Sequence, residues 1–143
     1  MDEILKLEIG HKIDALVGEK AFDRPITWID YWGLGEKTPY FVDIKAIKTS
    51  EHSTSAGMIG ANWQKYRDEN GEIKEFYGRN VPQYSKSLDN MVNIEREIKK
   101  SGKIDDYITN LKLVTDSKDG PEDIFKLITA SALDRCKAFL LTI

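Results

Sequence analysis

The chain has 143 residues, of which 41% are hydrophobic and 31% charged, and these fractions exclude a disordered or membrane-embedded protein. This length suffices for one hydrophobic core and predicts a single domain over residues 1–143. A net charge of −3 excludes broad, sequence-independent binding of a nucleic acid duplex, which depends on an excess of Lys and Arg.

The N-terminal residues and the cysteine content both predict a cytoplasmic protein. Acidic residues stand where a signal peptide would carry basic ones, and no apolar run approaches the roughly 18 residues of a membrane span. Cys136 is the only cysteine, which rules out an intrachain disulfide. Its place in an apolar helical stripe predicts a small buried side chain rather than a nucleophile.

Residue spacing in the first half of the chain predicts one helix followed by strands. Apolar residues three and four apart indicate a helix over residues 10–20. Residues 26–32 and 40–48 are rich in β-branched and aromatic side chains, which favours two antiparallel strands. Residues 51–57 are small, polar and aperiodic, which is typical of a loop.

A β-hairpin is predicted over residues 62–80. Its turn contains Asn70-Gly71, the strongest short hairpin signal, because both central residues of a type I′ turn need a positive φ. The hairpin carries aromatic side chains interleaved with cations.

The second half of the chain predicts a helix, two strands and a closing helix. The middle helix lies within residues 81–102 and has a mostly apolar face. Alternating residues favour a strand over 106–117, and residues 124–129 form a further strand after a turn at 118–123. Ser131 is placed to cap the closing helix.

This order of elements predicts an α+β fold. We expect an antiparallel sheet with helices packed on its faces, an α-β-α sandwich, because that arrangement buries one side of every element. Residues 23–78 are expected to form a mainly-β segment inserted within the domain.

Arg135 and the hairpin are the candidate binding residues. Arg135 lies early in the closing helix, near backbone amides that favour an anion, so it is suited to a phosphate. The alternative is that Arg135 pairs with a carboxylate or covers the edge of the core. Asp134 beside it is suited to ribose hydroxyls.

Four hairpin residues complete the candidate ligand site. Aromatic rings beside cations suit a stacked nucleotide base whose phosphates are held nearby. The alternative is an amphipathic hairpin with one aromatic face packed on the core. The four candidates are Phe76, Tyr77, Arg79 and Asn80.

Motifs for catalysis and metal binding are absent from the sequence. There is no GxGxxG, GxxxxGK[ST] or GxSxG, and no cluster of Cys, His and carboxylates at metal spacing. His52 lies beside Glu51 and three hydroxyl residues, but a polar loop has the same composition. We therefore expect a binding protein, not an enzyme, with no cofactor and no metal.

Three stretches resemble the phage ABA-sandwich domain family. Residues 10–20 (GHKIDALVGEK) resemble its opening helix, and Pro82-Gln83-Tyr84-Ser85 resembles the Pro-x-Tyr-Ser before its middle helix. Residues 128–140 resemble its closing segment, in which small residues precede a stripe around a Cys. The chain departs from the family at His11, where Arg is usual, and in the much longer segment 23–78.

Some members with this plan resemble the phage anti-Thoeris sponge proteins, which sequester cyclic ADP-ribose isomers and in some cases cyclic oligonucleotides. The resemblance implies a homo-oligomer, a dimer or higher, with ligand pockets at subunit boundaries and no hydrolysis. It also implies the cytoplasm of the infected bacterial host, and it carries Arg135 over as a phosphate-binding position.

We therefore expect a phage anti-defence protein that binds and sequesters a cyclic nucleotide immune signal without cleaving it. The alternative is a small phage protein-binding module that inhibits a host or defence protein through the aromatic hairpin surface. A structural component of the virion is a third possibility.

Overall fold

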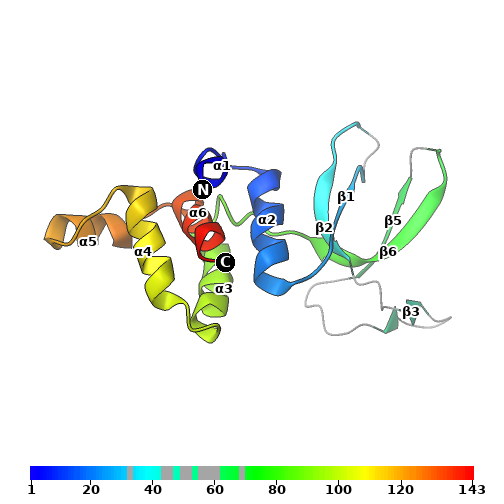
Figure 1. The fold of residues 1–143 in the computed structure, drawn as a ribbon. Coiled ribbons are helices and arrows are strands. Elements are labelled where there is room, and N and C mark those ends of the chain that lie inside the picture. Colours follow the sequence, from blue (N-terminus) through cyan, green and yellow to red (C-terminus); the bar gives the residue numbers. More distant parts are fainter. Residues whose placement is uncertain (32–33, 43–46, 49–52, 55–61, 68–69) are drawn as a thin grey trace. The chain divides into compact units, whose positions relative to one another are not determined.

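The computed structural model describes residues 1–31, 34–42, 47–48, 53–54, 62–67 and 70–143, which divide into two compact units (Figure 1). The helical unit comprises residues 1–23 and 82–143, and the sheet unit comprises residues 24–81. The expected α+β class with an antiparallel sheet is confirmed. The sheet unit covers nearly the same residues as the segment that the sequence predicts to be inserted.

The helices of the helical unit begin and end at recognisable signals. Ser87 and Ser131 cap α3 and α6, accepting hydrogen bonds from the backbone N–H groups of Asn90 and Asp134. Asp23 ends α2 with a φ of 49°. The predicted first, middle and closing helices are thus confirmed. The helices are α1 (Asp2–Leu5), α2 (His11–Phe22), α3 (Leu88–Lys100), α4 (Ile104–Thr115), α5 (Pro121–Ile128) and α6 (Ala132–Thr142).

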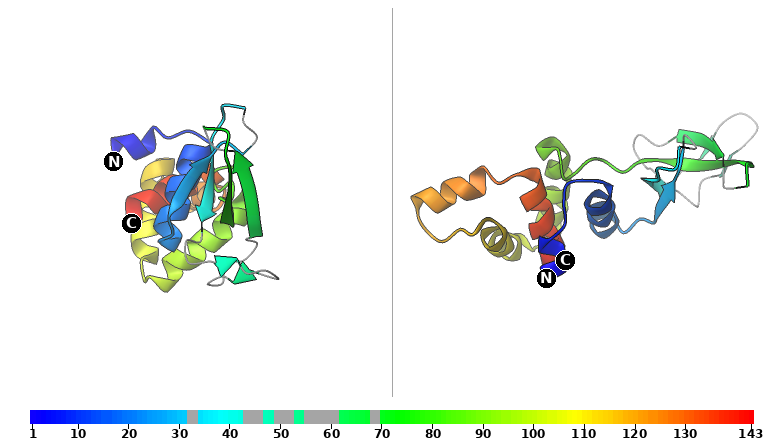
Figure 2. Two further views of the ribbon diagram at one scale, coloured as in Figure 1. Left: turned by 90° about the vertical axis from the view of Figure 1, so that its right-hand side faces the viewer. Right: turned by 90° about the horizontal axis from the view of Figure 1, so that it is seen from above.

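Helix α6 lies at the centre of the helical unit. It packs against α2, α3 and α4, and both views in Figure 2 place it among these helices. Cys136, in the middle of α6, is fully buried, and its Sγ lies 3.4 Å from Sδ of Met91. Burial raises the pKa of the Cys136 thiol to about 12, so it is an unreactive core residue, as expected. The other fully buried apolar residues of this core include Ile13, Val17, Met91, Ile94 and Phe139.

A buried carboxylate joins the two chain segments that make up the helical unit. Asp14 of α2 is 1% exposed, and its Oδ1 accepts a 2.7 Å hydrogen bond from the backbone N–H of Ser85. The Ser85 hydroxyl in turn accepts a 3.1 Å hydrogen bond from the backbone N–H of Gly10. These bonds fix the N-terminal segment to the turn before α3.

Two predicted strands are wrong, because both stretches are helical. Residues 106–117 lie mainly in α4, whose buried residues Tyr107 and Leu111 are four apart, the spacing of a helix and not of a strand. Residues 124–129 lie in or directly after α5, which also takes in part of the predicted turn at 118–123. Gly120 before the helix, Pro121 at its start and two acidic residues in its first turn favour a helix there.

The sheet unit contains a four-stranded antiparallel sheet with the strand order β1-β2-β6-β5. Among the described residues, strands β2 and β6 join its two hairpins through the pairs Tyr40↔Asn80, Phe41↔Arg79 and Val42↔Gly78. Ile29, Tyr40 and Phe76 form a buried cluster on one face. The strands are β1 (Ile26–Ile29), β2 (Thr38–Val42), β3 (Ile47–Lys48), β4 (Ser53–Thr54), β5 (Asn62–Arg67) and β6 (Ile73–Asn80).

The predicted hairpin at 62–80 is confirmed, but its turn differs from the expected type. In the observed register Arg67 pairs with Ile73, whereas a two-residue turn at Asn70-Gly71 would pair Arg67 with Lys74. Gly71 has a φ of 79°, but the register excludes a two-residue type I′ turn at Asn70-Gly71.

Two further predictions fall largely on residues outside the described ones. In the predicted 51–57 loop, Ser53–Thr54 pair as β4 with β3, and residues 51–52 and 55–57 lie outside the description. Residue 32 and residues 43–46 of the predicted strands also lie outside it.

Candidate functional site

Arg135, near the start of α6, makes hydrogen bonds through all three of its side-chain nitrogens. Nη1 donates to both carboxylate oxygens of Glu95, at 3.2 and 3.1 Å. Nε and Nη2 donate to the backbone carbonyls of Ala130 and Ile128, each at 3.1 Å. The Tyr107 hydroxyl donates to Glu95 as well, at 3.1 Å. The network therefore ties α3, α4 and the α5–α6 connection to α6.

This network favours a structural role for Arg135, which is the alternative that its sequence position leaves open. The side chains of Arg135 and Glu95 are only 19% and 30% exposed, so the pair is largely shielded from solvent. Burial and then the nearby charge of Glu95 raise the pKa of Tyr107, so its hydroxyl remains a donor. Asp134 lies half-buried in the first turn of α6, where its backbone N–H donates to Ser131.

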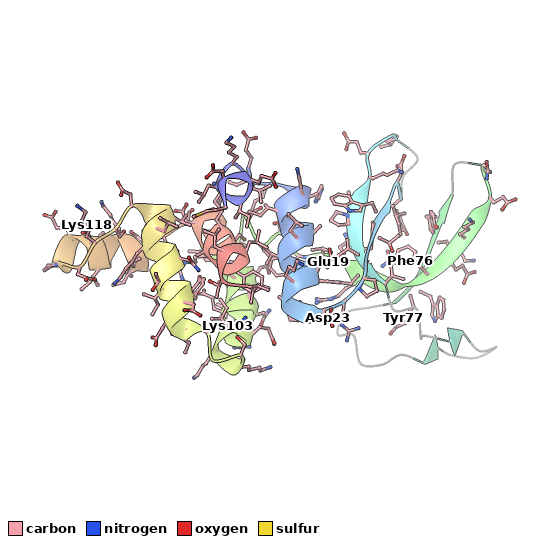
Figure 3. The ribbon with its side chains drawn as sticks, viewed as in Figure 1. Glu19, Asp23, Phe76, Tyr77, Lys103 and Lys118 are labelled. Atoms are coloured by element: carbon pink, nitrogen blue, oxygen red, sulfur yellow. The ribbon has the colours of Figure 1, made fainter. Side chains whose placement is uncertain are left out.

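The four hairpin candidates are divided between the two faces of the sheet. Figure 3 shows the side chains of Phe76 and Tyr77 on opposite sides of β6, as strand geometry requires for neighbours. Phe76 is 8% exposed and belongs to the buried cluster, and Asn80 shares its side of the strand. Tyr77 and Arg79 lie on the other side, so one ligand lying on a single face of the sheet does not contact all four residues.

Tyr77 and Arg79 lie next to two further aromatic residues on their face. Strand register places Trp63 opposite Tyr77 and Phe41 opposite Arg79. The rings of Trp63 and Tyr77 meet edge to face at 5.5 Å between centroids, and the Arg79 guanidinium lies 5.1 Å from the centroid of Phe41. We call these four residues the aromatic–arginine face.

The position of Arg79 on this face suits an anion. The Phe41 ring holds the guanidinium by a cation–π contact, which leaves its planar edges to donate hydrogen bonds. Its Nε is buried and has no hydrogen-bond partner among the residues that the structure describes. A planar cation beside aromatic rings combines a hydrogen-bond donor for a phosphate with surfaces on which a base can stack.

The sequence suggests Tyr77 and Arg79 as candidates but gives no sign that Phe41 is the ring beneath Arg79. The hairpin signal relates Trp63 to Tyr77 only when the turn length is known, because a shift of one residue changes every pair. Phe41 reaches the site through the pairing of β2 with β6, which no local signal in either strand specifies.

A shallow cavity of about 210 Å³ lies between α4 and α6. It is smaller than the usual 300–1,000 Å³ of small-molecule pockets. A hydrogen bond of 3.0 Å from Asn110 to Thr142 already occupies two of its polar groups. This cavity is therefore a weaker candidate site than the aromatic–arginine face. Its lining residues are Asp106, Thr109, Asn110, Leu141 and Thr142.

Within the described ranges, no group of three or more His, Cys, Asp or Glu side chains is arranged to hold a metal ion. His52 and Glu51, the residues that most resembled an acid–base pair in the sequence, lie outside the described residues. No helix in the described part of the chain combines the length and apolar character that crossing a bilayer requires.

Comparison with known proteins gives no matching family model, and neither a curated protein nor a solved structure matches the chain.

Proposed function

We propose that this chain binds a cyclic nucleotide immune signal, such as a cyclic ADP-ribose isomer or a cyclic oligonucleotide, and sequesters it without cleavage. In this proposal the protein is a phage anti-defence factor acting in the cytoplasm of the infected host. The class of ligand rests on the resemblance to the phage ABA-sandwich family. The contact residues rest on the aromatic–arginine face.

One observation supports this function above the others. Arg79 lies over Phe41 beside the Trp63–Tyr77 ring pair, so a cation and stacking surfaces occupy one face of the sheet. In the proposed complex, Arg79 donates charge-assisted hydrogen bonds to a phosphate while a base stacks on Tyr77 or Trp63. No acid–base pair is needed, since capture requires tight binding and slow release, not bond cleavage.

The proposal moves the phosphate contact from Arg135 to Arg79. Arg135 already donates to Glu95 and to two backbone carbonyls, so giving it to a phosphate would break a mostly buried ion pair. In this proposal Arg135 and Asp134, which belong to the helical unit, do not contact the ligand.

Calorimetry with cyclic ADP-ribose isomers and cyclic di- and trinucleotides tests the proposal. Arg79→Ala should weaken binding of the captured ligand by roughly tenfold or more, the size of a lost charged hydrogen bond. Lys74→Ala is the matched control. Lys74 is an exposed cation on the same strand, but it lies on the opposite face of the sheet from Arg79. Ligand released by denaturing the complex should be chemically intact.

Failure of every tested nucleotide to bind would reject the proposed function. Cleaved ligand in the released fraction would indicate an enzyme instead. Binding that survives Arg79→Ala unchanged would remove the aromatic–arginine face from the proposal. The alternative, a protein-binding module, is favoured if a host protein is retained by the wild type and lost when exposed Ile73 of the hairpin is replaced by Glu.

A further inference from the structure

The cavity between α4 and α6 is built from the start of one helix and the end of the other. Asp106 and Asn110 lie about one turn apart on α4, and Thr109 lies beside them. Leu141 and Thr142 come from the last turn of α6. Helices α4 and α6 pack against each other inside the helical unit, as both views in Figure 2 show, so the cavity belongs to one compact unit.

The carboxylates at the start of α4 give this cavity a negative potential. Asp106 is exposed, and within the described part of the chain its side chain forms no ion pair. Asp105, the residue before it, adds a second negative charge to the same turn. Together they outweigh the roughly half positive charge that the start of a helix carries. The cavity therefore attracts a cation and repels an anion such as a phosphate.

The end of α6 adds to this negative potential. The C-terminal end of a helix carries roughly half a negative charge, which comes from carbonyl groups without a partner inside the helix. Among the described helices, α2, α3, α4 and α5 each have a basic residue in their last turn, and α6 has none. A cation bound in the cavity would lie where Lys or Arg lies at the ends of the other four helices.

The amide of Asn110 is held in an orientation that suits a hydrogen-bond donor. Its Nδ2 donates a 3.0 Å hydrogen bond to the Thr142 hydroxyl, which itself donates to the Ala138 carbonyl at 2.7 Å. These bonds hold the amide nitrogen toward α6, so the amide oxygen remains as an acceptor. The exposed Thr109 hydroxyl supplies another acceptor. A carboxylate, an amide oxygen and a hydroxyl match the three N–H donors of a primary ammonium group.

The size of the cavity limits its ligand to a small chemical group. Its volume of about 210 Å³ corresponds to roughly seven water molecules at their volume in the liquid, which is too little for a nucleotide. Leu141 gives the cavity an apolar wall that can cover the methylene groups of an aliphatic amine. A divalent metal ion is disfavoured, because no three His, Cys, Asp or Glu side chains of the described ranges are grouped to hold one.

We propose that this cavity binds a primary ammonium group on a short aliphatic chain, with Asp106 as its counter-ion. Thr109 and Asn110 accept further hydrogen bonds from the ammonium, and Leu141 covers the chain. A free alkylamine and a lysine side chain of another protein share this chemistry. The site does not depend on the proposed nucleotide ligand, because all of its residues belong to the helical unit.

Nuclear magnetic resonance of the isotope-labelled full chain tests this site, with butylamine and Nα-acetyllysine amide as probes. Butylamine should shift the backbone amide signals of Asp106, Asn110 and Thr142 in a saturable way at constant ionic strength. Butanol has the same length without the charge and should leave these signals unchanged. Binding of butylamine alone indicates a free amine as the ligand, whereas binding of both probes indicates that the site also accepts a lysine side chain.

Two matched variants separate this site from a general attraction between opposite charges. Asp106→Asn should weaken butylamine binding roughly fivefold, the upper range for an exposed ion pair. Asp105→Asn removes the same charge from the same turn, but Asp105 does not line the cavity, so the dissociation constant should stay nearly unchanged. Equal weakening by the two variants would overturn the proposal. The same holds if butylamine shifts none of the three signals, or if butanol or NaCl shifts them as butylamine does.

Discussion

Arg135 stabilises the helical unit through a shielded ion pair. Replacing it with Ala leaves the mostly shielded Glu95 carboxylate with the Tyr107 hydroxyl and a limited contact with solvent. The expected loss in the free energy of unfolding is about 2 kcal/mol, somewhat less than for a fully buried pair because both side chains keep some solvent contact. Urea denaturation followed by circular dichroism measures this loss.

Arg96→Ala is the matched control for that measurement. Arg96 is on α3, and its Nη1 makes one long hydrogen bond of 3.4 Å to exposed Asn93. Removing it should change the free energy of unfolding by less than about 0.5 kcal/mol. Equal effects of the two replacements would show that the Arg135–Glu95 pair contributes no more than a surface contact.

Asp14 makes the stability of the helical unit depend on pH. Burial raises the pKa of its carboxyl above the ordinary 3.8, although hydrogen bonds from Ser85 act in the opposite direction. The folded state therefore holds this proton more tightly than the unfolded state. The stabilisation by protonated Asp14 is complete below pH 3.8 and is lost as the pH rises through the higher folded pKa.

Asp14→Asn should remove this contribution to the pH dependence and keep the hydrogen bond from the Ser85 N–H. The variant should gain stability relative to the wild type as the pH rises from about 4 to 7. Asp14→Ala should lower the free energy of unfolding by about 1–3 kcal/mol at every pH in this range, because the buried Ser85 N–H loses its acceptor. If the free energy of unfolding depends on pH in the same way for the wild type and Asp14→Asn, the pKa of the Asp14 carboxyl is not raised in the folded state.

At the scale of the element, local signals predicted the helices that have caps and the hairpin whose aromatic residues alternate. They failed for α4, where the alternate positions of Tyr107, Leu111 and Leu113 suggested a strand, although Tyr107 and Leu111 are also four apart, which is the spacing of a helix. They failed again for α5, whose apolar face is exposed, so its periodicity does not mark a core. Packing against α6 and the acidic first turns outweigh β propensity in α4.

The candidate site was predictable only in part for a related reason. Alternation along β6 follows from the sequence and separates Tyr77 and Arg79 from Phe76. The partner of Arg135 also had a signal, since Glu95 lies four residues after Met91 and three before Ile98, both buried on α3, and a carboxylate there needs a cation. The contact of Arg79 with Phe41 depends on pairing between distant strands, and neither strand encodes that register alone.

At the scale of the whole molecule, each of the two units has buried residues of its own. The helical unit is assembled from both ends of the sequence, and its core residues come from α2, α3, α4 and α6. The sheet unit has its own cluster around Tyr40 and Phe76. We therefore expect that weakening the pairing of β2 with β6 destabilises the sheet unit before the helical unit.

Gly78→Ala tests this separation. A Cβ at Gly78 would overlap the backbone carbonyl oxygen of Phe41, so the two strands would have to move apart and the pairing of β2 with β6 would weaken. We expect a loss of roughly 2 kcal/mol from overpacking. Hydrogen exchange should rise in β2 and β6, while the amides of α3 and α6 keep their protection. Asn80→Ala, an exposed change on the same strand, should leave both patterns unchanged. Equal loss of protection in α6 and β6 would show instead that the two cores unfold as one.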